Sequence, residues 1–101
     1  MIPRKQRLAA AKGLAFLEAK YPGCTDKFNL ETLDISDRDH CALAQASGRS
    51  YGVAKHELDL LEVKAIEYGL ISYAPTHVGA LRVCKWLTAA YKELILERRA
   101  A

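Results

Sequence analysis

Long apolar runs are absent from this sequence. No window of it approaches the uninterrupted apolar length of a membrane-spanning helix. A basic cluster near the start of the chain, Arg4, Lys5 and Arg7, precedes a short run of small apolar residues and superficially resembles the start of a secretory signal. Lys12 and Glu18 interrupt that run, so no apolar signal core forms. The sequence therefore predicts a soluble protein of the cytoplasm with no membrane partner.

Cysteine is scarce and glycine is dispersed. Cys24, Cys41 and Cys84 are odd in number and widely spaced, so neither a complete disulfide framework nor a Cys-x-x-Cys metal site fits within one chain. Because free cysteine is among the most buried residue types, we expect reduced thiols that are mostly buried. The six glycines form no phosphate-binding motif. We therefore expect no cofactor and no metal ion.

What is present is the composition of an ordinary globular domain. Of the 101 residues, 50% are hydrophobic and 27% are charged, which predicts one packed domain over residues 1–101. Lys and Arg outnumber Asp and Glu by 15 to 12. The resulting formal charge of +3 is too small to require a polyanionic partner, but it allows local basic patches.

The longest stretch without a helix-ending residue runs from Thr76 to Arg99. Thr76 follows Pro75 and is expected to cap the helix. At 1.5 Å per residue the helix would be roughly 35 Å long, enough to cross a small domain. Two apolar rows recur along it at steps of three and four residues. They are Leu81, Cys84, Leu87, Tyr91 and Leu94, and beside them Val83, Trp86 and Ala90.

Shorter helical patterns precede it. Ser36 and Asp39 have the S-x-x-D form of a weak capping box, which predicts a helix start at Asp37. Gly48 and Gly69 are expected to end helices as left-handed residues. The expected segments are a helix over Arg4–Tyr21, an irregular segment over Cys24–Ile35 whose apolar side chains enter the core, a helix over Asp37–Ala46, a short helix within Ser50–Leu58, a helix from Asp59 to Gly69, and an extended stretch from Leu70 toward Pro75.

These patterns predict an all-α single domain in which four or five helices pack on the long C-terminal helix. The spacing of the apolar residues also predicts which of them form the core. The expected core residues are Leu14, Leu17, Leu33, Leu43, Leu61, Ile66, Leu81, Leu87, Tyr91 and Leu94.

No catalytic or metal-binding constellation is evident. His40 and Cys41 are adjacent on an expected helix, so their side chains point about 100° apart and cannot hydrogen-bond as a base and its nucleophile. Asp34, Asp37 and Asp39 lack the glycine and the terminal glutamate of a calcium loop. We therefore expect a packed thiol, a surface imidazole and no enzymatic activity.

DNA binding is the strongest specific alternative. Residues 42–53 resemble the turn region of a helix-turn-helix, with Ala44 followed by Gly48 four residues later. Three features depart from that pattern: Ala54 stands where a branched apolar residue is usual, Arg49 stands where an apolar residue is preferred, and Gly52 lies inside the expected recognition helix. The residues placed to reach phosphates or base edges are Arg49, Tyr51, Lys55 and His56.

The chain also resembles a family of small, mostly uncharacterised proteins encoded by phages of actinobacteria, particularly mycobacteriophages. The resemblance spans nearly the whole chain and rests on six short words in a fixed order. They are Gly13 to Leu17, Tyr21-Pro22-Gly23, Asn29-Leu30-x-Thr32-Leu33-Asp34-Ile35, Cys41-Ala42-Leu43-Ala44-Gln45, Glu67-Tyr68-Gly69 and Leu87 to Ile95. The resemblance implies a phage accessory protein made in the host bacterial cytoplasm and directed at a host component.

The leading hypothesis is therefore a phage protein that acts by binding a host protein. The alternative is a small DNA-binding regulator that uses the four residues of the helix-turn-helix pattern. Self-association through an apolar residue such as Phe16 or Leu96 is a third hypothesis.

Overall fold

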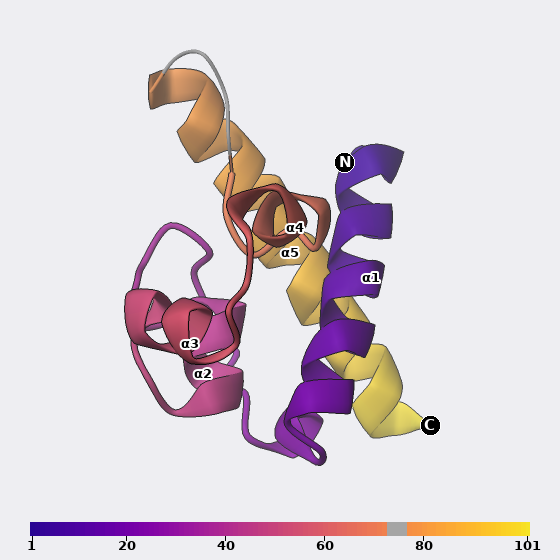
Figure 1. The fold of residues 1–101 in the computed structure, drawn as a ribbon. Coiled ribbons are helices and arrows are strands. Elements are labelled where there is room, and N and C mark those ends of the chain that lie inside the picture. Colours follow the sequence, from indigo (N-terminus) through magenta and orange to yellow (C-terminus); the bar gives the residue numbers. More distant parts are fainter. Residues whose placement is uncertain (73–76) are drawn as a thin grey trace.

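A computed structural model describes residues 1–72 and 77–101, and the described chain is helical without any strand (Figure 1). This confirms the all-α fold with a long C-terminal helix. None of the helices in these ranges is long and apolar enough to cross a membrane. The expected cap at Thr76 and the end of the extended stretch, Tyr73 to Pro75, lie outside the described residues. The helices are α1 (Arg4–Lys20), the 3-10 helix η1 (Cys24–Asp26), α2 (Ala42–Ser47), α3 (Tyr51–Glu57), α4 (Glu62–Glu67) and α5 (His77–Ala100).

The most extensive helix contact is between α1 and α5. Figure 1 shows α1 lying beside the later part of α5, with α4 near the place where the two helices approach. Gly13 permits this approach: a Cβ atom there would lie 1.9 Å from both the Tyr68 carbonyl oxygen and the Tyr91 hydroxyl. That hydroxyl donates a 2.6 Å hydrogen bond to the same carbonyl. One glycine thus allows α1, α5 and the end of α4 to meet.

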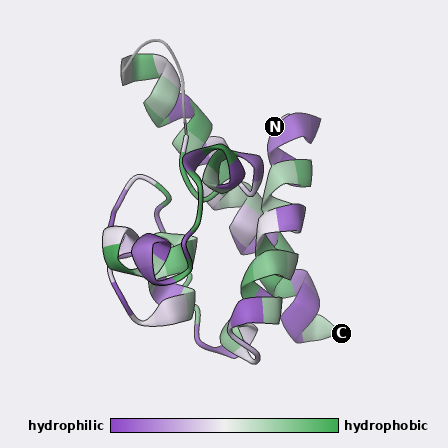
Figure 2. Ribbon diagram, viewed as in Figure 1, coloured by the Kyte–Doolittle hydropathy of each residue, from purple (hydrophilic) through white to green (hydrophobic). Residues whose placement is uncertain are grey.

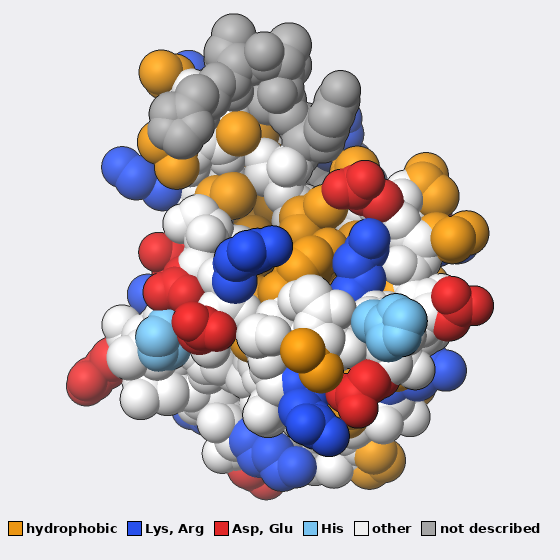
Figure 3. All heavy atoms as spheres, turned by 60° about the vertical axis from the view of Figure 1, so that its left-hand side comes forward, with side chains coloured by type: hydrophobic (Ala, Val, Ile, Leu, Met, Phe, Trp, Pro, Cys, Tyr) orange, Lys and Arg blue, Asp and Glu red, His pale blue; other side chains and the backbone are white. Residues whose placement is uncertain are grey.

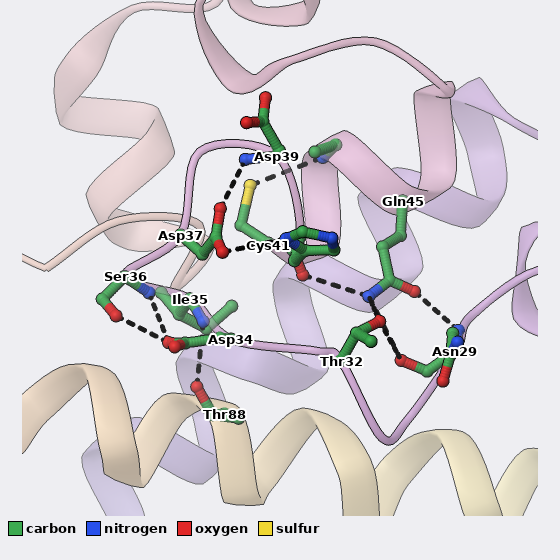
Figure 4. Close-up of polar contacts among 12 residues, drawn as sticks. Asn29, Thr32, Asp34, Ile35, Ser36, Asp37, Asp39, Cys41, Gln45 and Thr88 are labelled. Atoms are coloured by element: carbon green, nitrogen blue, oxygen red, sulfur yellow. Dashed lines mark hydrogen bonds and ion pairs between the residues drawn. The ribbon is translucent and has the colours of Figure 1, made fainter.

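The segment between η1 and α2 is irregular and enters the core, as the sequence predicted. Phe28, Leu33 and Ile35 are buried. The Gln45 side chain of α2 holds the segment by accepting from the Asn29 N–H at 2.6 Å and donating to the Asn29 carbonyl at 3.2 Å (Figure 4). At its other end Thr88 of α5 accepts a 3.0 Å hydrogen bond from the Ile35 N–H. The segment is therefore tied to both α2 and α5.

The predicted helix start at Asp37 is wrong, because α2 begins at Ala42. The side chains expected to cap it have other partners. The Ser36 hydroxyl donates to the Asp34 carboxylate at 2.6 Å, and the Asp37 carboxylate accepts from the Asp39 N–H at 2.9 Å. Short polar side chains that bond to nearby backbone or hydroxyl groups compete with helix formation.

The predicted start of the fourth helix at Asp59 is also wrong. Asp59 has a positive φ of 52°, and the following N–H, that of Leu60, donates back to the Lys55 carbonyl to close α3. Helix α4 then begins at Glu62. The stops at Gly48 and Gly69 are confirmed, with φ angles of 74° and 62°. Glycine is favoured at both positions because a Cβ atom disfavours positive φ.

Six of the ten expected core residues are buried, and Leu94 is partly buried. Leu61, Ile66 and Leu81 were predicted wrongly, since they are 65%, 36% and 43% exposed. Leu61 precedes α4, and this short helix buries only Ala65 in the core. Leu81 is in the first two turns of α5, and Figure 1 shows α1 lying beside the later part of that helix. Buried residues outside the expected core list include Ala10, Leu70 and Ile95, while the burial of Cys24 and Cys41 agrees with the expectation of buried thiols.

Candidate functional site

Between residues 78 and 86, α5 has no fully buried residue. The buried residues of this helix begin at Leu87, whereas Val78 and Leu81 are exposed and Cys84 is half-buried. Figure 2 shows hydrophobic residues on the beginning of α5, where the helix extends beyond α4. Exposed apolar residues are individually ordinary, but a contiguous group of them beside a hollow is typical of a binding surface.

Two adjoining hollows run beside this part of α5. The outer one has a volume of about 400 Å³ and the inner one about 360 Å³, and they share Ser36, Leu81 and Cys84. Figure 3 shows a hydrophobic surface in this region, bordered by Lys and Arg side chains. We call the two hollows together the α5 groove. Its main apolar and aromatic lining residues are Ile35, Tyr51, Ile71, Val78, Leu81 and Cys84.

Tyr51 lines the inner hollow, and its hydroxyl oxygen is buried. Within residues 1–72 and 77–101 this oxygen has no hydrogen-bond partner. Burial raises the pKa of Tyr51 to about 12, with smaller contributions from Cys41 and Glu62, which line the same hollow. A buried hydroxyl without a partner is rare in folded proteins. Tyr51 therefore lines the inner hollow with other atoms of its side chain or backbone, while its protonated hydroxyl is buried away from solvent.

The two thiols of the inner hollow are not activated. Burial raises the pKa of both Cys41 and Cys84, so both stay protonated at neutral pH. The Cys41 sulfur caps α2 by accepting from the Ala44 N–H at 3.4 Å. Since the thiolate is the nucleophile and the metal ligand, these thiols favour packing over reaction.

The rim of the α5 groove is charged. Arg82 and Lys85 of α5 line the outer hollow and have no ion-pair partner in the described parts of the chain. Opposite them lies Asp34, whose carboxylate accepts from the Ser36 N–H and hydroxyl. Arg38 and Glu62 border the inner hollow. The wall formed by α5 is cationic, and the facing wall carries both signs.

The structure places three of the four candidate residues of the helix-turn-helix pattern at one hollow. Helices α2 and α3 meet across Gly48. Tyr51, Lys55 and His56 line one hollow of about 510 Å³, and His56 is exposed. Arg49 does not line this hollow, and instead pairs with Glu57 at 3.4 Å. Because the Tyr51 hydroxyl is buried, it cannot reach a phosphate in this arrangement.

His40 and Cys41 both precede α2, so they do not lie on a helix as expected, but their side chains still lie in different surroundings. His40 is exposed and its Nδ1 atom lies 2.8 Å from Asp37 Oδ2, while Cys41 is buried. The Asp39 N–H, and secondly the His40 ring, hold the pKa of Asp37 below its usual value. Within the described ranges, no group of three or more His, Cys, Asp or Glu residues is placed to hold a metal ion.

The two apolar residues considered for self-association differ in their surroundings. Phe16 stacks on Tyr68 with ring centroids 4.6 Å apart, and Lys20 lies over the Phe16 ring at 5.9 Å. Leu96 remains exposed on the second half of α5. Of these two residues, Leu96 is thus the more exposed.

No family model, curated protein or solved structure matches this chain. The resemblance to actinobacteriophage proteins and the functional hypotheses therefore stay predictions. The groove itself was not predicted from the sequence. Its walls come from segments far apart in the chain, and the exposure of Leu81 was the opposite of what its periodicity indicated.

Proposed function

We propose that this protein is a non-enzymatic phage accessory protein that binds a host protein through the α5 groove. The observation that carries the proposal is the uncovered apolar half of α5. Val78 and Leu81 are exposed beside two adjoining hollows, and burying them against a partner would remove apolar surface from water. Grooves lined by helices are a recurrent way of recognising a segment of another protein.

The chemistry of the groove also favours binding over catalysis. Its thiols are held in the protonated form, and its tyrosine has a raised pKa. Catalytic groups are usually poised to change protonation near the working pH. The groove instead combines apolar walls with a few polar atoms, which is typical of a binding site.

Capture of a host protein from actinobacterial cytosol tests this proposal. The tagged full chain should retain one host protein, and Leu81→Asp should abolish the retention because a carboxylate opposes burial of that surface. Leu96→Asp is the matched control. It makes the same change at another exposed leucine of α5, about 22 Å away along the helix axis.

Circular dichroism of both variants should show that each remains helical. The proposal fails if the wild-type chain retains no host protein. It also fails if Leu81→Asp retains as much of that protein as Leu96→Asp does.

A DNA-binding regulator is the second candidate, and the helix-turn-helix arrangement of α2 and α3 favours it. Lys55 and His56 would supply the contacts at the exposed side of α3. This function predicts duplex binding at low salt that weakens as salt rises, because phosphate contacts release counterions. Lys55→Glu should weaken duplex binding. Lys12→Glu, which makes the same charge change on the exposed side of α1, should weaken it less. Absence of binding at low salt would eliminate the regulator.

A further inference from the structure

We draw no further inference here: the strongest candidate, the hollow of about 510 Å³ beside α3, is lined by side chains of both charges, Arg38 and Lys55 with Asp59 and Glu62, and nothing in the described parts of the chain shows which ligand would occupy it.

Discussion

The beginning of α5 (residues 77–86, called its first half) and the rest of the helix (residues 87–100, called its second half) carry similar apolar side chains in different surroundings. In the second half, Leu87, Tyr91 and Ile95 are buried against the rest of the domain. In the first half, Val78 and Leu81 are exposed beside the groove. Figure 1 shows the reason, because α1 lies beside the later part of α5 and does not cover its beginning. The same helix thus serves as core at one end and as surface at the other.

This difference suggests that the two halves of α5 have different roles, one in stability and the other in binding. Side chains of the second half are expected to contribute mainly to the free energy of unfolding. Side chains of the first half are expected to contribute mainly to partner binding, and changes there should leave the fold intact. The four predictions that follow test this separation, in order of decreasing effect.

The largest expected effect comes from truncating one leucine in each half. Leu87→Ala should lower the free energy of unfolding by about 2–5 kcal/mol, because it opens a cavity in the core. Leu81→Ala makes the same change at an exposed site and should cost about 0.5 kcal/mol or less. Urea unfolding followed by circular dichroism measures both. Similar losses of unfolding free energy in the two variants would refute the distinction between a buried and an exposed half of α5.

The close approach at Gly13 should be nearly as sensitive. Gly13→Ala places a Cβ atom against the Tyr68 carbonyl and the Tyr91 hydroxyl, so the helices must move apart at a cost of about 1–3 kcal/mol. Gly52→Ala is the control, since no atom lies within 4 Å of its added Cβ. It should stabilise α3 by about 0.5–1 kcal/mol. A Gly13→Ala protein that unfolds at the wild-type urea concentration would contradict the packing described for α1 and α5.

Removing the hydroxyl of Tyr91 and removing that of Tyr51 should have different effects on the free energy of unfolding. Tyr91→Phe loses the hydrogen bond to the Tyr68 carbonyl and should destabilise the protein by about 0.5–1.5 kcal/mol. Tyr51→Phe removes a donor without a partner in the described chain, so stability should be unchanged or slightly higher. The comparison uses thermal or urea unfolding. A larger loss for Tyr51→Phe would mean that its hydroxyl is already satisfied in the free protein.

The smallest effect concerns alkaline pH. The pKa of Tyr51 is raised from 10.0 to about 12 in the folded state, so the unfolded state loses its proton first as pH rises. The contribution of Tyr51 to stability is therefore complete below about pH 10 and is lost between about pH 10 and 12. Tyr21 and Tyr91 have raised pKa values too, so the decline should persist in Tyr51→Phe but be shallower. Identical slopes of unfolding free energy against pH would contradict the burial of Tyr51.

Much of the fold could be predicted from local sequence. Helix α1 ends within one residue of its expected limit at Tyr21, and Gly48 and Gly69 end helices as expected. These features depend on periodicity and on the conformational freedom of glycine, which act over a few residues. The starts of α2 and α4 could not be placed in the same way. The capping patterns do not reveal that the Ser36 hydroxyl bonds to Asp34 instead. They also do not reveal that the Asp59 backbone has a positive φ.

The candidate site was less predictable than the fold. The sequence analysis identified Tyr51 as a possible phosphate contact, whereas its hydroxyl is buried. It also placed Leu81 in the core, where the structure has an exposed side chain at the edge of a groove. The apolar character of both residues was plain from the sequence. The neighbours that cover or uncover them come from distant segments.

The sequence by itself determined that this chain forms helices, that the longest one lies toward the C-terminal end, and that its apolar face supports a single core. Those outcomes follow from residue spacing and from the propensities of neighbouring residues. Only the tertiary structure decided where that apolar face is covered. Burial depends on which helices reach a given turn of α5, and α1 packs against the later turns without covering the first ones.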